Sequence, residues 1–274
     1  VARPHIGVVT AVSNAHTQRV GSIEGVTKAK RELVDSLQSD DIAILNADDS
    51  NVLSMRHATQ ALVLTFGESD SASVRMISCE VDQWGCATAN VKTPWGDAKL
   101  SLSVPGRHMM HNALAALCVA GVLKLDIARA AEAISKSNIS PSRMQIRKLN
   151  NGAVVLDDSY NANPASMRAA LETLTTISGV RRIAFCGLMA ELADPSQDHL
   201  AIASLAKQNR IELVAVETDL YGVQPVSFSQ ARQVLSELGE GDLVLVKGSK
   251  VAGLVRLCDG LGGDVQFGNE PDTT

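Results

Sequence analysis

Polar side chains follow directly on an apolar run in the segment "VVLDDSYNANP", residues 154–164. Ligands of open α/β sheets bind beyond the carboxyl ends of parallel strands, and this segment reads as such an end. Asp158 could accept a hydrogen bond from a ribose hydroxyl, while Asn161 and Asn163 could contact a ligand or brace the turn. The pattern equally allows Asp157 and Asp158 to cap a helix, with Asn163 and the next proline forming a turn.

A second candidate group lies in "VPGRHMMHNALAAL", a glycine turn followed by a helical pattern. His108, His111 and Asn112 stand at positions i, i+3 and i+4, so they share one face near the start of the helix. An asparagine amide can pair with N6 and N7 of adenine. Two histidines at this spacing could also hold a metal ion, and an ordinary polar helix start remains an alternative.

Three further loops follow predicted strands. His16 and Lys30 lie in "SNAHTQRVGSIEGVTKAKRE", after the first strand, where a solvated lysine is the usual alternative. Lys247 and Ser249 lie in "LVLVKGSKVAG", where free N–H groups at a helix start favour an anion. Glu191 is the acidic residue of "CGLMAEL". The sequence contains no GxxxxGK[ST] phosphate loop.

Two patterns of elements must position these residues. In the first half, "IGVVTAV", "IAILN" and "ALVLTFG" predict buried parallel strands, and three alternating segments between residues 74 and 104 predict an antiparallel meander. Helices are expected in "EGVTKAKRELVDSL", in "HMMHNALAALCVAGVL", and in "LDIARAAEAISKS", with Asp126 as N-cap. The segment 137–144, "SNISPSRM", is the best domain boundary.

From residue 145 strands and helices alternate, which predicts a mostly parallel sheet covered by helices on both faces. The expected strands and helices are 153–156, 165–177, 182–186, 196–207, 211–216, 229–238, 242–246 and 250–260, in that order.

Composition limits the classes of function. The chain has 274 residues, 45% of them hydrophobic, and a net charge of −5. The charge does not favour nucleic acid, and the longest apolar stretch, "ALAALCVAGVL", is too short to cross a membrane. Five irregularly spaced cysteines are typical of reduced thiols in a cytoplasmic protein.

Taken together, several stretches resemble the Mur ligase family: "SNAH", "GSIEGVTKAKRELV", "LNADD", "PGRHMMHNALAAL", "SRM", "LDDSYNANPASM", "GLMAEL" and "LVKGSK" occur in the family's order. The resemblance is greatest to the members that add D-alanyl-D-alanine to UDP-N-acetylmuramoyl-tripeptide. It implies an α/β fold in which residues 1–140 form the C-terminal part of the central ATP-binding domain, with a mixed sheet. Residues 141–274 would form the Rossmann-like C-terminal domain.

The resemblance implies a nucleotide site. Asp158 would hold the ribose of ATP, Asn112 would contact adenine, and His108, Tyr160 and Asn161 would lie close to the nucleotide. The family's UDP-binding domain and phosphate loop are not matched by these residues, so the 274-residue chain is expected to be a fragment that is inactive alone.

The resemblance also implies catalytic groups and Mg²⁺. Arg143 would reach the phosphates, and His16 would lie near the second magnesium ion. Lys30 would carry a carbamate, which turns a cation into an anionic metal ligand. ATP would phosphorylate the tripeptide carboxylate before the amine of D-alanyl-D-alanine attacks.

The substrate contacts implied by the resemblance are Lys247, Ser249, Glu191 and Asn163, around the dipeptide or the tripeptide carboxylate. The full-length protein is expected to be a cytoplasmic monomer, without nucleic-acid binding or membrane insertion. Another ligase of the superfamily, such as a folylpolyglutamate synthetase, and a non-catalytic nucleotide-binding module remain alternatives.

The sequence departs from the family pattern at three places. Met109 stands where the family has asparagine after "GRH", and Leu188 stands where it has aspartate in "GDMAEL". Ser142 replaces the glycine that usually precedes the arginine matched by Arg143.

Overall fold

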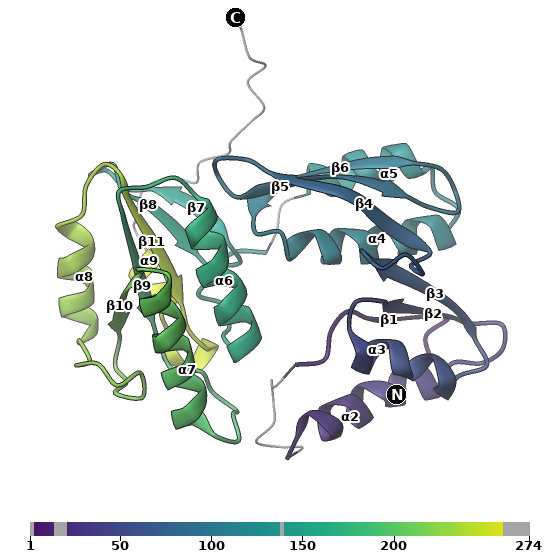
Figure 1. The fold of residues 1–274 in the computed structure, drawn as a ribbon, viewed down its shortest axis with the longest axis horizontal. Helices are drawn as coiled ribbons and strands as arrows, with labels where there is room; N and C mark the ends of the chain where they lie inside the picture. Colours follow the sequence, from purple (N-terminus) through teal and green to yellow (C-terminus); the bar gives the residue numbers. More distant parts are fainter. Residues whose placement is uncertain (1–2, 14–20, 138–139, 260–274) are drawn as a thin grey trace, which may run out of the picture.

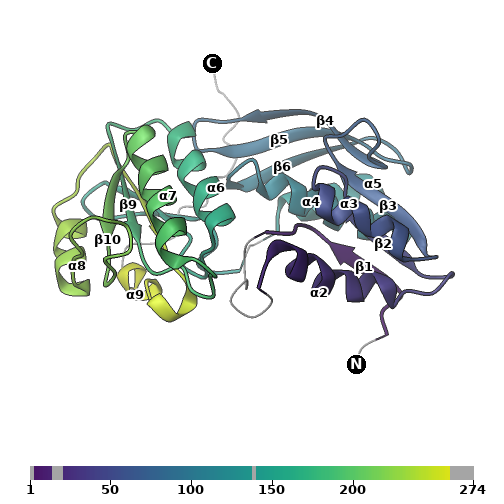
Figure 2. The same ribbon diagram turned by 60° about the horizontal axis from the view of Figure 1, so that its bottom comes forward.

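The computed structural model describes residues 3–13, 21–137 and 140–259. The described residues form two α/β units, each built around its own sheet (Figure 1). In both ribbon views α6 (Pro164–Thr176) lies on the side of the second unit that faces the first (Figure 2).

The first sheet has the strand order β1-β2-β3-β4-β5-β6. Strands β1 to β4 are parallel to one another, and β4, β5 and β6 form the antiparallel meander that the sequence predicts. The strands are β1 (Ile6–Val9), β2 (Ile42–Asn46), β3 (Leu62–Gly67), β4 (Val74–Val81), β5 (Cys86–Lys92) and β6 (Ala98–Pro105).

Both faces of this sheet are buried at β2, because successive side chains point to opposite sides of a strand. Ala43 and Leu45 belong to the apolar cluster that includes Val26 and Val34 of α2. Ile44 belongs to the cluster on the other face, with α4. A continuous apolar run such as "IAIL" is the pattern that such double burial requires.

Three helices of the first unit, α2, α3 and α5, begin at a residue whose side chain caps them. Asp126 accepts a hydrogen bond from the amide of Arg129 and caps α5, as predicted. Asp49 caps a short helix, α3, that the sequence reading missed. The elements are α2 (Ile23–Asp35), α3 (Ser50–Ser54), the 3₁₀ helix η1 (Met55–Ala58), α4 (Met109–Val122) and α5 (Ile127–Ser135).

The second sheet has the order β10-β9-β11-β8-β7. All neighbours are parallel except β7, which runs antiparallel to β8. The strands are β7 (Gln145–Lys148), β8 (Val154–Asp157), β9 (Arg181–Cys186), β10 (Glu212–Ala215) and β11 (Asp242–Lys247).

Helices cover both faces of the second sheet, as the alternating pattern predicts. The apolar cluster on one face includes Leu171 of α6 and Ile202 of α7, and the cluster on the other includes Ala231 of α8 and Leu257 of α9. Besides α6, the helices are α7 (Pro195–Gln208), α8 (Phe228–Ser236), the 3₁₀ helix η2 (Lys250–Ala252) and α9 (Val255–Cys258).

One expectation about the second unit was wrong, and one strand was missed. A single helix over 250–260 is replaced by η2 and α9, because Gly253 takes a left-handed conformation (φ 64°) that interrupts the helix. The edge strand β7 was not predicted, since "QIRK" carries two cations and lacks a strand-like apolar run.

The two units touch near the end of β6. The side chain of Trp84, in the β4–β5 turn, packs against the core of the second unit. Gly106 has a φ of 107°, and a Cβ there would come within 2.5 Å of the His108 ring and 3.3 Å of the Thr173 hydroxyl. Glycine at this position therefore lets the chain turn into α4 at the contact between the units.

The five cysteines are free thiols, four of them buried. Burial raises the pKa of Cys86, Cys118 and Cys186 to about 12, with Asp82 adding to the rise at Cys86. In the described part of the chain, no helix combines the length and apolarity needed to span a membrane.

Candidate functional site

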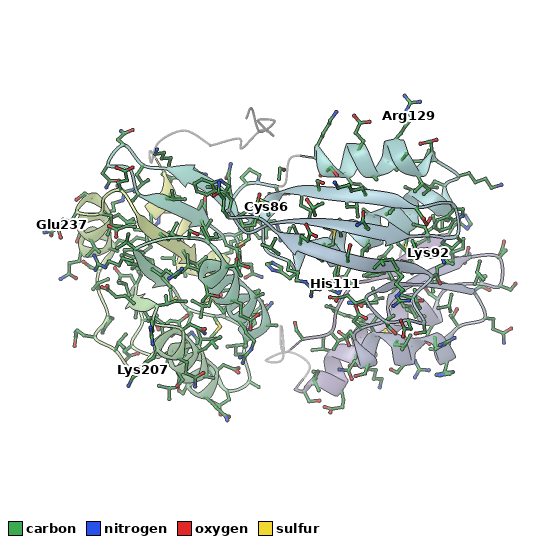
Figure 3. The ribbon with its side chains drawn as sticks, turned by 45° about the horizontal axis from the view of Figure 1, so that its top comes forward. Cys86, Lys92, His111, Arg129, Lys207 and Glu237 are labelled. Atoms are coloured by element: carbon green, nitrogen blue, oxygen red, sulfur yellow. The ribbon has the colours of Figure 1, made fainter. Side chains whose placement is uncertain are left out.

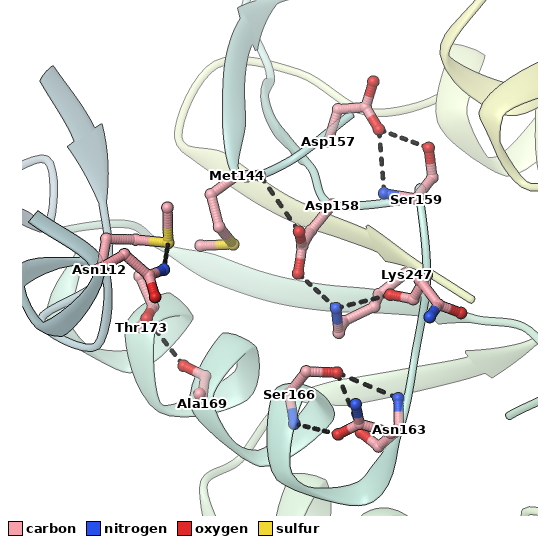
Figure 4. Close-up of polar contacts among 12 residues, drawn as sticks. Asn112, Met144, Asp157, Asp158, Ser159, Asn163, Ser166, Ala169, Thr173 and Lys247 are labelled. Carbon is pink, nitrogen blue, oxygen red and sulfur yellow. Dashed lines mark hydrogen bonds and ion pairs between the residues drawn. The ribbon is translucent and has the colours of Figure 1, made fainter. Parts of the chain in front are cut away.

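The strand-end carboxylate predicted to bind ribose, Asp158, is paired with Lys247. The ammonium of Lys247 lies 2.5 Å from Oδ2 of Asp158 and also donates to the carbonyl of Asn161 at 3.0 Å. The other carboxylate oxygen accepts the amide of Met144 at 3.2 Å. Figure 4 shows these groups together at the carboxyl ends of β8 and β11, where the sheet places ligands.

Asp157 has a different role from its neighbour. It is fully buried and accepts hydrogen bonds from the hydroxyl and the amide of Ser159 and from the hydroxyl of Ser142. The guanidinium of Arg147 forms an ion pair with it at 3.1 Å. Asp157 therefore ties β7 and the segment before it to the end of β8.

Arg143 lies in a backbone conformation that other residues hold in place. Its neighbours Ser142 and Met144 have φ values of 59° and 52°, the left-handed region that costs a non-glycine residue about 1–3 kcal/mol. The amide of Tyr160 bonds the carbonyl of Ser142, and Asp158 holds the amide of Met144. The exposed guanidinium of Arg143 then stacks on the Tyr160 ring, 4.2 Å from its centroid.

The alternative in which Asp157 and Asp158 cap a helix is wrong. Asn163 is the N-cap of α6 and forms a reciprocal capping box with Ser166, while Pro164 occupies the first turn. Asn163 therefore caps a helix, and the expected turn of Asn163 with Pro164 is not seen. Asn161 has an exposed side chain, and its carbonyl binds Lys247.

The start of α4 faces this group from the first unit. Loss of solvation by burial of the ring lowers the pKa of His108. The charge of Asp158 opposes this, and the charge of Lys247 adds to it. Asn112 is exposed, and its amide makes a long contact of 3.8 Å with the sulfur of Met109. In Figure 4 Asn112 approaches from the first unit and Asp158 from the second.

His111 points elsewhere, to the end of β2. Its Nε2 lies 3.0 Å from Asp48, whose carboxylate also accepts the amides of Glu68 and Ser69. Burial opposes ionisation of Asp48, but these hydrogen bonds outweigh it and lower its pKa. A Cβ at Gly67 would come within 2.4 Å of this carboxylate. Figure 3 shows His111 near the middle of the molecule.

Lys30 lies on α2, apart from the group around Asp158. Its amine donates to the carbonyl of Ala11 at 2.5 Å. Burial of the amine lowers the pKa of Lys30, and Asp49 opposes this. A lower pKa favours the neutral amine, which is the form that reacts with carbon dioxide. His16, the other predicted metal ligand, lies outside the described residues.

The described residues do not make a magnesium site by themselves. Across 3–13, 21–137 and 140–259, no three acidic, histidine or cysteine side chains converge. The carboxylate of Asp49 is occupied by the amides of Val12, Asn51 and Val52. Lys30 would supply an oxygen ligand only as a carbamate.

The "GLMAEL" and "LVKGSK" loops lie against each other. Ser249 is buried, and its hydroxyl donates to the carbonyl of Leu188 at 2.7 Å and accepts from the amide of Ala190 at 2.6 Å. Ser249 therefore lies between the two loops and links them. Glu191 follows with a φ of 62°.

Sequence reasoning missed several residues that shape the site. Arg147 and Asp48 gave no signal beyond ordinary charge, because their partners come from distant segments. His199 resembled a polar residue near a helix start, although it is fully buried and bonds the amide of Met189. The available signal was a histidine in an otherwise amphipathic helix after "GLMAEL".

The fold agrees with comparisons to known proteins. Residues 1–120 match the Mur ligase middle domain, and residues 142–250 match the family described as Mur ligase, glutamate ligase domain. The chain belongs to the Mur ligase family.

Its relatives within that family carry a more specific name. The chain is 31% identical over 309 aligned residues to the UDP-N-acetylmuramoyl-tripeptide–D-alanyl-D-alanine ligase of Mycobacterium leprae, covering 96% of this chain and 60% of the relative. The crystal structure of MurF from Acinetobacter baumannii superposes with a TM-score of 0.83 at 25% identity, over 93% of this chain and 59% of that one.

A MurF ligase from Thermotoga maritima, solved in complex with ADP, has the same fold. It superposes with a TM-score of 0.81 at 19% identity, over 94% of this chain and 61% of that one. This chain thus spans about 60% of the length of the relatives it matches.

Proposed function

We propose that this chain is the nucleotide- and acceptor-binding part of a MurF-type ligase, which joins D-alanyl-D-alanine to UDP-N-acetylmuramoyl-tripeptide at the expense of ATP. The observation that carries this proposal is the ion pair of Asp158 and Lys247 at the ends of β8 and β11, close enough for both charges to affect the pKa of His108 on α4. Polar groups converge there at the carboxyl ends of β8 and β11 and at the start of α4.

The proposal divides the chain near residue 141, with residues 1–140 as the rest of the central domain and 141–274 as the C-terminal domain. The two sheets end and begin on either side of that point, at Pro105 and Gln145. Arg143 lies at the junction, where a change of backbone conformation would move its guanidinium relative to the first unit.

In the proposed nucleotide site, Asp158 accepts hydrogen bonds from the ribose and Asn112 pairs with adenine. The exposed amide of Asn112 and the partly exposed carboxylate of Asp158 come from different units. Arg143 would leave or extend from its stack on Tyr160 to reach the phosphates, because a guanidinium binds phosphate oxygens through two parallel hydrogen bonds.

The proposed reaction passes through an acyl phosphate. The tripeptide carboxylate attacks the γ-phosphorus of ATP and ADP leaves; the amine of D-alanyl-D-alanine then attacks the acyl carbon, loses a proton and releases phosphate. Arg143 and Lys247 would offset the negative charge that develops on phosphate and carboxylate oxygens. Magnesium, when bound, would neutralise phosphate charge, and a carbamate on Lys30 would be an anionic ligand for it.

The proposal includes a cytoplasmic, monomeric full-length protein that binds its substrates without nucleic acid or membrane insertion. Its test is phosphate release by the full-length protein with ATP, Mg²⁺ and UDP-N-acetylmuramoyl-tripeptide, using D-alanyl-D-alanine, single amino acids and glutamate as competing acceptors. Turnover that depends on D-alanyl-D-alanine supports the proposal. Turnover with another acceptor alone would assign a different ligase of the family.

A further inference from the structure

The loop after β9 is held by hydrogen bonds from three directions. The amide of Gly187 donates to the carbonyl of Lys247 at 2.9 Å, and the hydroxyl of Tyr221 donates to the carbonyl of Gly187 at 2.8 Å. Ser249 holds Leu188 and Ala190 from the side of β11. We call residues 187–192 the β9 loop.

The third direction is His199, on α7. Its Nε2 lies 2.9 Å from the amide of Met189, and its Nδ1 lies 2.5 Å from the carbonyl of Pro195. A backbone amide can only donate and a carbonyl can only accept. The proton must therefore sit on Nδ1, and Nε2 must be the acceptor for Met189.

His199 suits this task only while it is neutral. Protonation would put a second N–H opposite the Met189 amide and break the hydrogen bond. Burial lowers the pKa of His199, although the Pro195 carbonyl and Asp198 oppose this. The ring of Tyr221 meets His199 edge to face, with centroids 4.7 Å apart, and fills the space beside it.

We propose that His199 is a positioning residue for the incoming D-alanyl-D-alanine, acting through the Met189 amide on the β9 loop. The inference rests on the proposed ligase function, which places Glu191 of this loop beside the acceptor. Glu191 has a left-handed backbone (φ 62°), which directs the chain only while Met189 and Ala190 stay fixed. His199 of α7 and Ser249 at the start of η2 hold those two amides.

Two substitutions separate positioning from simple filling of space. In His199→Gln, the side-chain oxygen can take the place of Nε2 and still accept from Met189. In His199→Asn, the shorter amide reaches the position of Nδ1 and the Pro195 carbonyl but not the Met189 amide. Both variants are polar and smaller than histidine, so each controls for the loss of ring volume in the other.

The first measurement is hydrogen exchange of individual amides in the 274-residue chain, followed by NMR. We expect exchange at Met189 to rise about tenfold or more in His199→Asn, and much less in His199→Gln. Amides of β11, such as Leu245, should be unaffected. Unchanged exchange at Met189 in His199→Asn, or an equal rise at Leu245, would overturn the positioning role.

The second measurement uses the full-length protein. His199→Asn should raise the KM for D-alanyl-D-alanine about tenfold, leave the KM for ATP unchanged, and be largely rescued in His199→Gln. Equal changes in both KM values would indicate general damage and contradict the proposal. So would an unchanged acceptor KM in a variant whose Met189 amide exchanges faster.

A further variant keeps the experiment decisive if His199→Asn fails to fold. Tyr221→Phe retains the ring against His199 but removes the hydroxyl that holds the Gly187 carbonyl. It should raise the KM for D-alanyl-D-alanine in the same direction as His199→Asn, and an unchanged value would count against the β9 loop as an acceptor platform. If the unmodified enzyme does not use D-alanyl-D-alanine, the proposed function fails, whereas the exchange measurement still decides what His199 does.

Discussion

Lys247 and Asp158 form an ion pair in which the lysine side chain is 2% exposed and the aspartate side chain 15% exposed. The pair joins the ends of two neighbouring strands, β11 and β8. Because a buried ammonium needs a counter-charge, any ligand that binds Asp158 also changes the surroundings of Lys247. The proposed ribose site and the proposed carboxylate site are thus electrostatically linked.

Replacing Asp158 is therefore expected to affect both ATP binding and stability. Asp158→Ala in the full-length protein should raise the KM for ATP, since a charged hydrogen bond contributes roughly 1.5–3 kcal/mol. In the 274-residue chain it should lower the free energy of unfolding by about 3–5 kcal/mol, because Lys247 loses its counter-charge. Urea unfolding measures the second effect.

The control for Asp158 is the double variant Asp158→Ala with Lys247→Met. Removing both charges should recover much of the lost stability, because no uncompensated buried charge remains. A double variant that is less stable than Asp158→Ala alone would show that the pair itself is not what stabilises this end of the sheet.

Lys30 is expected to form a carbamate. Its lowered pKa, caused by burial, increases the fraction of neutral amine that can react with carbon dioxide. Lys30→Ala in the full-length protein should abolish most activity, and short carboxylic acids should restore part of it. Lys28 is an exposed lysine on the same helix, and Lys28→Ala is the matched control.

A direct readout for Lys30 is incorporation of ¹³C-bicarbonate into the 274-residue chain, followed by NMR. The carbamate signal should appear in the unmodified chain and in Lys28→Ala, and be lost in Lys30→Ala. Full activity of Lys30→Ala would contradict the carbamate and show that Lys30 is an ordinary solvated lysine.

Limited proteolysis should separate the two units. Trypsin is expected to cut first after Lys136, an exposed side chain at the end of α5. Arg143 should be cut more slowly, since the following residue, Met144, is buried and its amide is bonded to Asp158. Mass spectrometry should find a stable piece that begins at Ser137. Early cuts between Val154 and Lys247 would mean that the boundary is misplaced.

The purified 274-residue chain should bind ATP no more tightly than about millimolar and release no phosphate above background. Positioning of the β and γ phosphates dominates phosphoryl transfer, and these 274 residues contain no GxxxxGK[ST] motif. Asn112 and Asp158 also belong to different units, so ordering them opposes binding. Calorimetry and a phosphate assay with both substrates provide the test, and micromolar binding would contradict it.

The free energy of unfolding should decrease at acidic pH because His199 is neutral in the folded protein. Because its pKa is lower in the folded protein than the ordinary value of 6.5, the unfolded chain takes up the proton first as the pH falls. The contribution of His199 is thus complete above pH 6.5 and is lost as the pH falls toward the folded-state pKa. The stability difference between the unmodified chain and His199→Gln should shrink from about pH 7 to about pH 5, measured by urea unfolding. A constant difference would contradict the assignment of a neutral His199.

The parallel strands of the second unit were predictable because burial on both faces requires continuous apolar runs, as in "LVLV" of β11. The strand-end position of Asp158 was predictable for the same reason. Its pairing with Lys247 was not, because it depends on β11 lying beside β8, and strand order in space does not follow strand order along the chain.

The remaining differences also have physical causes. The apolar spacing after residue 250 continues past Gly253, so the sequence predicted one helix. A glycine can either continue a helix or end it in a left-handed conformation, and here it ends the helix. The hydrogen bond from Met189 to His199 joins residues ten positions apart, and no periodicity marks such a contact.

The place of β11 between β8 and β9 has a consequence for biosynthesis. The strand made last lies in the middle of the second sheet, so the earlier pairs β7–β8 and β9–β10 cannot join into one sheet while the ribosome is still translating residues before Asp242. A nascent chain that stops short of this strand exposes the facing edges of β8 and β9, which holding chaperones or proteases would recognise. The ion pair between Asp158 and Lys247 therefore forms only after the central strand has been inserted.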